Sequence, residues 1–407
     1  MDSGSSIGWL LDVIIEQDHA TIWIKTIDGT ILKLRDKYKP SFYALPKDES
    51  TDEISHILSQ QPKIKKVEWK NRLTDLFDND EHGIKRLICV YLESLFNYKI
   101  LTRTLEKDQR VAQLFNTDLS HVQQYLFTRL KIEPTSKVEV QYDRNDSKLI
   151  TLAKISEVEV ALPPFSILYF ELDTELSRYN LGLHDVNDPI TKIRVRYEEE
   201  AQIMFQGNEE AILTDFCRYV LSKDPDILIS TEQYYQSTSV LRYLFARISE
   251  LGLHLGRENQ DNKRNNIEGR IYLDSLNLIE IIEKSRFAFL PLGLAARYGM
   301  IRLIDSRNCF ELINRGFVIP QCSNNIQEHI RTVEEIITRD KGGMIFSPQV
   351  GLHENVAVLD YEDEYANLIL KHNLSYETVP STGDNKSILP TVLESVLKRR
   401  TLFKNLQ

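Results

Sequence analysis

Apolar and polar positions alternate in short runs along the first part of the chain. Residues 10–15, 21–25 and 30–34 are short runs of β-type composition, as in strands. The dipeptide Asp28-Gly29 separates the last two runs, and Asp-Gly between alternating segments is a strong β-hairpin signal. These residues therefore predict an antiparallel meander.

The next segments mix helical and strand periods. Residues 52–60 and 118–130 have helical spacing, whereas 66–69, 87–91 and 138–140 are short β-type runs. Such a mixture predicts one α+β domain of about 150 residues, which is a common domain size.

Two consecutive prolines, Pro163 and Pro164, mark a boundary, because proline is excluded from helix interiors and from the middle of a sheet. We therefore predict a first domain at residues 1–160. In the second predicted domain, 161–325, strands and amphipathic helices alternate, as in an α/β layer. Residues 326–407 form the third predicted region. The expected strands of the second domain are 165–170, 193–197, 227–230 and 269–274, and the expected helices are 209–222, 240–248 and 278–283.

Three carboxylates follow the first strand of the second domain: Glu171, Asp173 and Glu175. Side chains at i and i+2 share one face of a strand, so these groups can converge. Converging carboxylates bind the metal pair of many nucleases, where the metals activate water and stabilise the leaving oxygen. A solvated acidic face is the alternative, and the pattern alone leaves both open.

Another acidic position follows residues 356–359, an apolar run of β-type composition. Asp360 stands at the end of this run, where a strand would present a carboxylate to Mg²⁺. Aspartate is also a preferred N-cap residue, so the alternative is that Asp360 caps the next helix.

Composition sets broad limits on the protein. Its 407 residues, 42% of them apolar, suffice for two or three domains, and no apolar run approaches the roughly 20 residues that span a bilayer. Residues 1–6 lack the features of a signal peptide, so we expect a soluble, cytoplasmic protein. The four cysteines are too widely spaced for a zinc site. A net charge of −10 argues against a surface that binds nucleic acid everywhere, although local basic patches remain compatible with it.

Several short motifs, taken in order, resemble landmarks of the archaeal family B DNA polymerases, and the resemblance covers nearly the entire chain. It implies an α/β and α+β multidomain fold: a polymerase N-terminal domain, an RNase H-like exonuclease domain, and a third region that holds a connector, the first palm segment and the start of the fingers helix. The motifs are Phe42-Tyr43-Ala44-Leu45, Phe170-Glu171-Leu172-Asp173-Thr174, Asp224-Pro225-Asp226-Ile227-Leu228-Ile229, Gly342-Gly343, Gly351-Leu352-His353-Glu354-Asn355-Val356 and Leu359-Asp360-Tyr361.

The resemblance assigns roles to the residues around Asp360. In that family an aspartate at this place holds the catalytic Mg²⁺ ions, and a tyrosine packs beneath the incoming sugar. Asp360 is the matching metal ligand, while Tyr365 and Tyr361 are the matching nucleotide-binding residues. The family's usual Pro-Ser is replaced here by Ala366-Asn367.

The exonuclease motifs depart from the family pattern. The first motif, Phe-Asp-x-Glu-Thr in the family, has its carboxylates exchanged at Glu171 and Asp173, and residues 231–238 contain no aspartate where the second motif requires one. For the third motif, Tyr298 is followed by Arg302 in the place of the aspartate. The resemblance therefore implies a vestigial exonuclease domain kept as a scaffold; residual metal binding by Glu171, Asp173 and Glu175 is the alternative.

The resemblance also suggests DNA contacts. The glycines Gly342 and Gly343 correspond to a hinge beside the template, although Asp340 replaces the family's tyrosine there. Phosphate contact and plain surface charge are equally compatible with the basic residues of the connector. The implied DNA-binding residues are Gly342, Gly343, Lys341, Arg339, Lys398 and Arg399, and the ambiguous connector residues are Arg302, Arg307 and Arg315.

The 407 residues contain no counterpart of the second palm aspartate motif, the triphosphate-gripping fingers helix or the thumb. Phosphoryl transfer needs these groups together, so we expect polymerase activity only with a second polypeptide that supplies them. The implied partners are template–primer DNA and that polypeptide, with a sliding clamp left open and no membrane. Mg²⁺ is expected in the assembled polymerase and not tightly bound to this chain alone. The expected location is the cytoplasm, in association with the nucleoid. The alternative function is a non-catalytic DNA-binding or replication-accessory scaffold.

Overall fold

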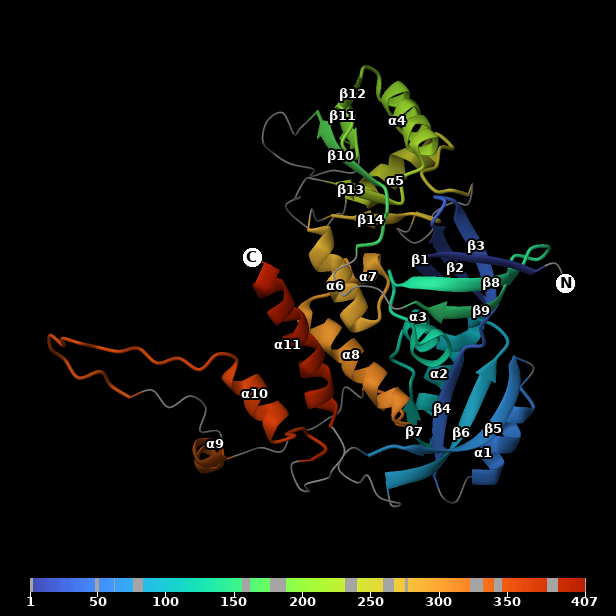
Figure 1. Cartoon of the computed structure of the whole chain (residues 1–407). Helices are drawn as coiled ribbons and strands as arrows, with labels where there is room; N and C mark the ends of the chain where they lie inside the picture. The colour runs from blue at the N-terminus through green and yellow to red at the C-terminus, as the bar shows by residue number, and fades with distance from the viewer. Residues whose placement is uncertain are drawn as a thin grey trace. The chain divides into compact units, whose positions relative to one another are not determined.

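The computed structural model divides into two compact units, residues 1–319 and 320–407 (Figure 1). The first unit contains three sheets and the second contains helices and extended segments. The structure describes residues 3–47, 51–61, 63–75, 83–155, 162–175, 188–230, 240–258, 267–274, 277–322, 332–339, 346–378 and 387–406.

A closed barrel opens the first unit. Its strands β1, β2 and β3 pair antiparallel in sequence order, which confirms the predicted meander. Gly29 has a φ of 88° in the turn between β2 and β3, a conformation that glycine adopts at little cost. Buried apolar side chains, among them Leu10, Ile22 and Val138, fill the interior. The barrel strands are β1 (Ser3–Ile15), β2 (His19–Thr26), β3 (Ile31–Lys37), β8 (Lys137–Asp143) and β9 (Lys148–Lys154).

A four-stranded antiparallel sheet follows, in the order β5-β6-β4-β7. The helices α1 (Thr51–Ser59) and α2 (Tyr98–Glu106) contribute Ile54, Leu58 and Leu105 to its core, as the helical spacing of residues 52–60 predicts for α1. The strands are β4 (Ser41–Pro46), β5 (Ile64–Leu73), β6 (Ile84–Leu92) and β7 (Val111–Phe115).

The predicted helix at 118–130 is present but changes form along its length. Ser120 and Gln123 form a capping box that starts α3 (His121–Tyr125), since each side chain bonds the other residue's backbone N–H. The chain then continues as a π-helix, Leu126–Leu130, and ends where Lys131 adopts a φ of 54°.

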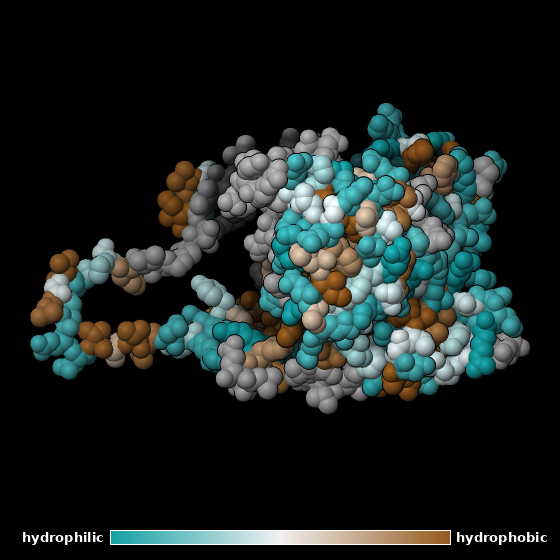
Figure 2. Space-filling model, turned by 90° about the horizontal axis from the view of Figure 1, so that it is seen from above, coloured by the Kyte–Doolittle hydropathy of each residue, from teal (hydrophilic) through white to brown (hydrophobic). Residues whose placement is uncertain are grey.

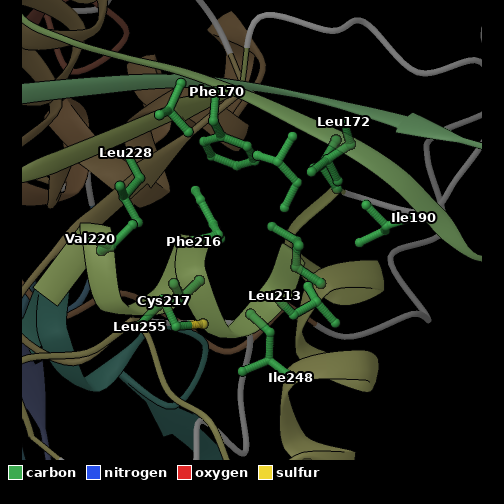
Figure 3. Close-up of a cluster of buried hydrophobic side chains, with 14 of the residues drawn as sticks. Phe170, Leu172, Ile190, Leu213, Phe216, Cys217, Val220, Leu228, Ile248 and Leu255 are labelled. Atoms are coloured by element: carbon green, nitrogen blue, oxygen red, sulfur yellow. The ribbon is translucent and has the colours of Figure 1, made fainter. Parts of the chain in front are cut away.

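The third sheet has the order β12-β11-β10-β13-β14, with β11 antiparallel and β13 parallel to β10, the arrangement of RNase H-like sheets. Along β10 (Ile167–Thr174), Leu168, Phe170, Leu172 and Thr174 are buried. The three apolar side chains pack against α4 (Glu209–Lys223) and α5 (Val240–Glu250); Figure 3 shows Phe170 and Leu172 facing Leu213 and Phe216. The other strands are β11 (Ile190–Tyr197), β12 (Ile203–Gln206), β13 (Ile227–Ser230) and β14 (Ile271–Leu273).

The opposite face of this sheet packs on helices and on the barrel. Ile227 of β13 and Ile281 of α6 belong to one cluster of buried side chains with Leu11 and Trp23 of the barrel. The sheet is therefore fixed to the barrel through a shared apolar core. The helices on this side are α6 (Leu278–Ala288), α7 (Leu292–Arg297) and α8 (Met300–Asn314).

The second unit contains α9 (Val333–Arg339), α10 (Glu364–Lys371) and α11 (Ile388–Leu406). Glu377 starts α11: its Oε1 accepts the N–H of Ile388 at 2.6 Å, and its Oε2 accepts the hydroxyl of Ser375. A carboxylate here compensates the unsatisfied N–H groups and the positive end of the helix dipole.

The predicted strand at 356–359 is wrong. These residues are extended but belong to no strand, and Val358 and Leu359 are 89% and 91% exposed. A strand needs a neighbour to bond its backbone groups, and the described residues of the second unit provide none. The segment forms the long orange loop without arrows in Figure 1, and brown apolar residues line it in Figure 2.

None of the helices in the described part of the chain combines the length and the apolar character needed to cross a bilayer.

Candidate functional site

Asp360 lies in the exposed extended segment before α10. It does not cap that helix, because α10 begins at Glu364 and the N-cap position belongs to Asp363. The capping alternative is therefore wrong, and the role of Asp360 as a metal ligand stays a prediction. Tyr361 and Tyr365 are 77% and 76% exposed, with Tyr365 in the first turn of α10.

Two other acids near Asp360 are engaged by α11. Lys404 pairs with Glu362, and Arg400 pairs with Asp363. The pairing with Lys404 lowers the pKa of Glu362 below its usual value. Asp360 forms no ion pair with any described residue, so of these three carboxylates it is the one that remains available to a ligand.

The predicted DNA-contact residues are only partly described. Lys398 pairs with Glu394 one turn earlier on α11 at 3.2 Å, but its side chain is 73% exposed. The Arg399 guanidinium lies 5.3 Å from the ring centre of Phe403. Lys341, Gly342 and Gly343 lie outside the described residues, as does the side chain of Arg339 at the end of α9.

Two of the three carboxylates that were predicted to converge, Glu171 and Asp173, lie together on β10. Glu171 and Asp173 share the face of β10 opposite Phe170 and Leu172. The Arg194 guanidinium, on β11, bridges them: Nη1 and Nη2 donate to the two carboxylate oxygens of Asp173 at 2.8 and 2.9 Å, and Nε donates to Glu171 Oε2 at 2.9 Å.

Glu175 stands apart from this bridge in the turn after β10, where its backbone N–H donates to the carbonyl of Pro189. Lys192 adds a second cation, with its Nζ 3.6 Å from Asp173 Oδ2. The hydrogen bond to Glu171, followed by that to Asp173, raises the pKa of Arg194 above its ordinary value. Among the described residues, no three histidine, cysteine or acidic side chains are placed to hold a metal ion.

Arg194 was not among the residues predicted from the sequence. Its signal was the alternation of Lys192, Arg194 and Arg196 on the strand after β10. In an antiparallel pair, opposite residues are close neighbours, and here Glu171 faces Arg194 while Asp173 faces Lys192. The pairing register was needed to connect these charges.

A second charge network, more deeply buried than the first, surrounds the Asp224-Pro225-Asp226 motif. Asp226 is fully buried, and its carboxylate accepts the N–H of Ser166 at 2.9 Å and Arg257 Nη2 at 2.8 Å. Lys25 from barrel strand β2 lies 3.1 Å away. This motif therefore ties the RNase H-like sheet to the barrel.

Asp224, at the edge of the same network, accepts Arg257 Nε at 2.8 Å and Arg270 Nη1 at 2.6 Å. Burial raises the pKa of Asp224, but the two guanidinium groups more than offset this, and the net pKa lies below its usual value. The side chain of Arg270 is itself buried and also bonds the carbonyl of Leu255.

The arginines of α8 have different surroundings. Arg302 is exposed, with its guanidinium 5.4 Å from the ring centre of Tyr298. Arg307 pairs with Glu311 at 2.7 Å and lies against three phenylalanine rings, Phe287, Phe289 and Phe310. The guanidinium of Arg307 is therefore engaged in packing within the protein, a role that lies outside the two alternatives of phosphate contact and plain surface charge.

Comparison with known proteins gives one family match. Residues 307–387 match the model of DNA polymerase family B. "DNA polymerase" of Archaeoglobus fulgidus is 20% identical over 93% of this chain and 55% of its own length. "DNA polymerase 2" of Saccharolobus solfataricus is 29% identical over 31% of this chain and 22% of its own length.

The fold has a counterpart among solved structures. The family B DNA polymerase from Pyrobaculum calidifontis superposes with a TM-score of 0.74 at 17% identity, covering 98% of this chain and 64% of that one. The chain spans about half the length of several curated relatives that it matches along nearly its whole extent. The resemblance to archaeal family B DNA polymerases, and with it the multidomain mixed fold, is confirmed.

Proposed function

We propose that this relative of the archaeal family B DNA polymerases is the N-terminal part of a DNA-directed DNA polymerase. In this proposal it binds template–primer DNA and contributes the first metal-binding aspartate of the palm, Asp360. The observation that carries the proposal is the family match over residues 307–387, which includes Asp360 and Tyr365.

The surroundings of Asp360 suit a Mg²⁺ ligand. Mg²⁺ prefers carboxylate oxygens, water and substrate phosphates, and Asp360 is exposed and unengaged by the described residues, whereas Glu362 and Asp363 are paired with cations. When bound, Mg²⁺ neutralises charge on the triphosphate and orients it for attack. One carboxylate does not complete such a site, so the second palm carboxylate must come from residues outside these 407.

Tyr365 is proposed to pack beneath the sugar of the incoming nucleotide. It lies in the first turn of α10, five residues after Asp360, with its ring 76% exposed. An exposed ring at the start of a helix can provide such a platform without rearrangement of the core. The role of Tyr361 is proposed on the same grounds, since its ring is 77% exposed.

The extended segment before Asp360 is proposed to pair with the rest of the palm. In extended backbone Val356 and Val358 face one side and Ala357 and Leu359 the other, so both sides are apolar. Such a run is typical of a strand inside a sheet that is covered on both faces. We propose that its neighbours come from the polypeptide with the second palm motif, either a further part of the same chain or a second chain.

Primer extension tests this proposal. The chain is mixed with a polypeptide that carries the fingers, second palm motif and thumb, and extension is measured with Mg²⁺. Asp360→Asn is expected to reduce extension by at least about a hundredfold, because metal-dependent charge stabilisation is among the largest catalytic contributions. Glu354→Gln, in the same exposed segment, is the matched control and should leave extension unchanged. Full extension by Asp360→Asn would refute the metal role.

A second candidate is a non-catalytic DNA-binding scaffold, which the neutralised carboxylates of β10 favour. Binding of single-stranded and primed DNA by the chain alone, across a salt series, separates the two candidates. Salt-sensitive DNA binding without any extension in the mixture supports the scaffold. Absence of binding at low salt rules out its DNA-binding form.

A further inference from the structure

The strand pair β10–β11 carries a charge arrangement that differs from what a proofreading relative requires. In an RNase H-like exonuclease the carboxylates at the end of the first strand hold metal ions, and Glu171 and Asp173 occupy that strand here. The residues do not fit this role, because three of their four carboxylate oxygens are already bonded to Arg194, a cation that belongs to the chain.

The geometry of that cation is close to ideal. Arg194 directs three N–H groups at three carboxylate oxygens, with donor–acceptor distances of 2.8 to 2.9 Å, and the contact with Asp173 is bidentate. Bidentate arginine–carboxylate pairs are among the stronger and more directional hydrogen bonds in proteins. Because β11 is paired with β10 along the strand, the guanidinium is held in register with both acids.

A divalent cation cannot share this position. Mg²⁺ binds oxygen at about 2.0 to 2.1 Å, so it would have to displace N–H groups that occupy the same lone pairs, next to a second positive charge. Arginine cannot remove that charge by losing its proton at physiological pH. Lys192, 3.6 Å from Asp173, adds further repulsion.

We propose that Arg194 is a permanent cation, supplied by the chain itself, that takes the place of the exonuclease metals. It converts Glu171 and Asp173 from metal ligands into a clamp between β10 and β11. This rests on the proposed function only in treating the sheet as related to a proofreading domain. The clamp excludes metal-dependent 3′-end cleavage by Glu171 and Asp173 even where both carboxylates are correctly placed.

Binding of Mn²⁺ to the full chain, followed by electron paramagnetic resonance without DNA, tests the proposal. The unmodified chain should have no Mn²⁺ site that depends on Asp173. Arg194→Ala should gain such a site. Its affinity for Mn²⁺ should exceed that of the same position in the unmodified chain by at least about tenfold, equivalent to about 1.4 kcal/mol. This gain should vanish in the double variant Arg194→Ala/Asp173→Asn.

Arg196→Ala is the matched control. It removes the same charge from the same face of β11, but Arg196 stacks on Tyr169 and is not bonded to the two acids, so no Mn²⁺ site should appear. Should Arg194→Ala not fold, Arg194→Gln keeps hydrogen-bonding groups without the charge and is expected to show a gain in the same direction. Circular dichroism establishes that each variant is folded.

Two results would overturn the proposal: an Asp173-dependent Mn²⁺ site in the unmodified chain, or a folded Arg194 variant with no gain. Release of labelled 3′ ends by the unmodified chain, lost in Asp173→Asn, would do the same. Because the measurement uses neither DNA polymerisation nor a partner, its failure would leave the outcome of the primer-extension test unaffected.

Discussion

Removing the charge of Asp226 should weaken the junction between the barrel and the RNase H-like sheet. In Asp226→Asn the side chain keeps its shape, but the buried cations Arg257 and Lys25 lose their shared anion. Their side chains are only 9% and 14% exposed, and that of Asp226 is fully buried. Solvent therefore cannot replace the lost interaction.

The magnitude follows from burial. Breaking a buried ion pair by removing one partner costs about 3–5 kcal/mol, because a charge is left without compensation. Arg257 keeps its 2.8 Å bond to Asp224, so the lower end, about 3 kcal/mol, is expected. For a domain of 150–250 residues this corresponds to a fall in Tm of roughly 6–12 °C.

Thermal unfolding followed by tryptophan fluorescence is a suitable assay, since Trp23 lies in the cluster shared by the barrel and the sheet. Asp215→Asn is the matched control: Asp215 also pairs with an arginine, Arg218, at 2.8 Å, but both side chains are more than half exposed. Exposed pairs contribute about 0–1 kcal/mol, so this control should barely change Tm. If the two variants had equal Tm values, the reasoning from burial would be refuted.

Two further predictions concern pH and the start of α11. Burial lowers the pKa of His121 from 6.5 to about 4, so the unfolded chain takes up a proton more readily than the folded chain. The free energy of unfolding should therefore be highest above pH 6.5 and fall by about 3 kcal/mol toward pH 4. In His121→Asn this loss of stability at acid pH should shrink. Denaturant titrations at several pH values give the free energy of unfolding at each pH. If that free energy fell equally with pH in both proteins, the assignment to His121 would be contradicted. In Glu377→Ala the amide hydrogen of Ile388 should exchange about 5–30 times faster, because it loses a charge-assisted bond worth about 1–2 kcal/mol. Amides near the middle of α11 serve as the internal control, and unchanged exchange at Ile388 would show that Glu377 does not cap the helix.

The local pattern of residues determined much of the fold. Local sequence patterns predict four barrel strands and four strands of the RNase H-like sheet, but miss β9 and β12. Asp28-Gly29 predicts the hairpin, because turn geometry depends on neighbouring residues alone. The same reasoning puts Glu171 and Asp173 on one face of β10. The order of short motifs also sufficed for the resemblance to family B DNA polymerases.

Tertiary structure decided what those residues contact. Arg194 becomes the partner of Glu171 and Asp173 only through the register of β11, and Lys25 meets Asp226 only because the barrel packs on the sheet. Local sequence does not encode such pairings, which depend on segments far apart in the chain. The run at 356–359 has the composition of a buried strand, yet it stays exposed, because strand formation requires a neighbouring backbone as well as a suitable sequence.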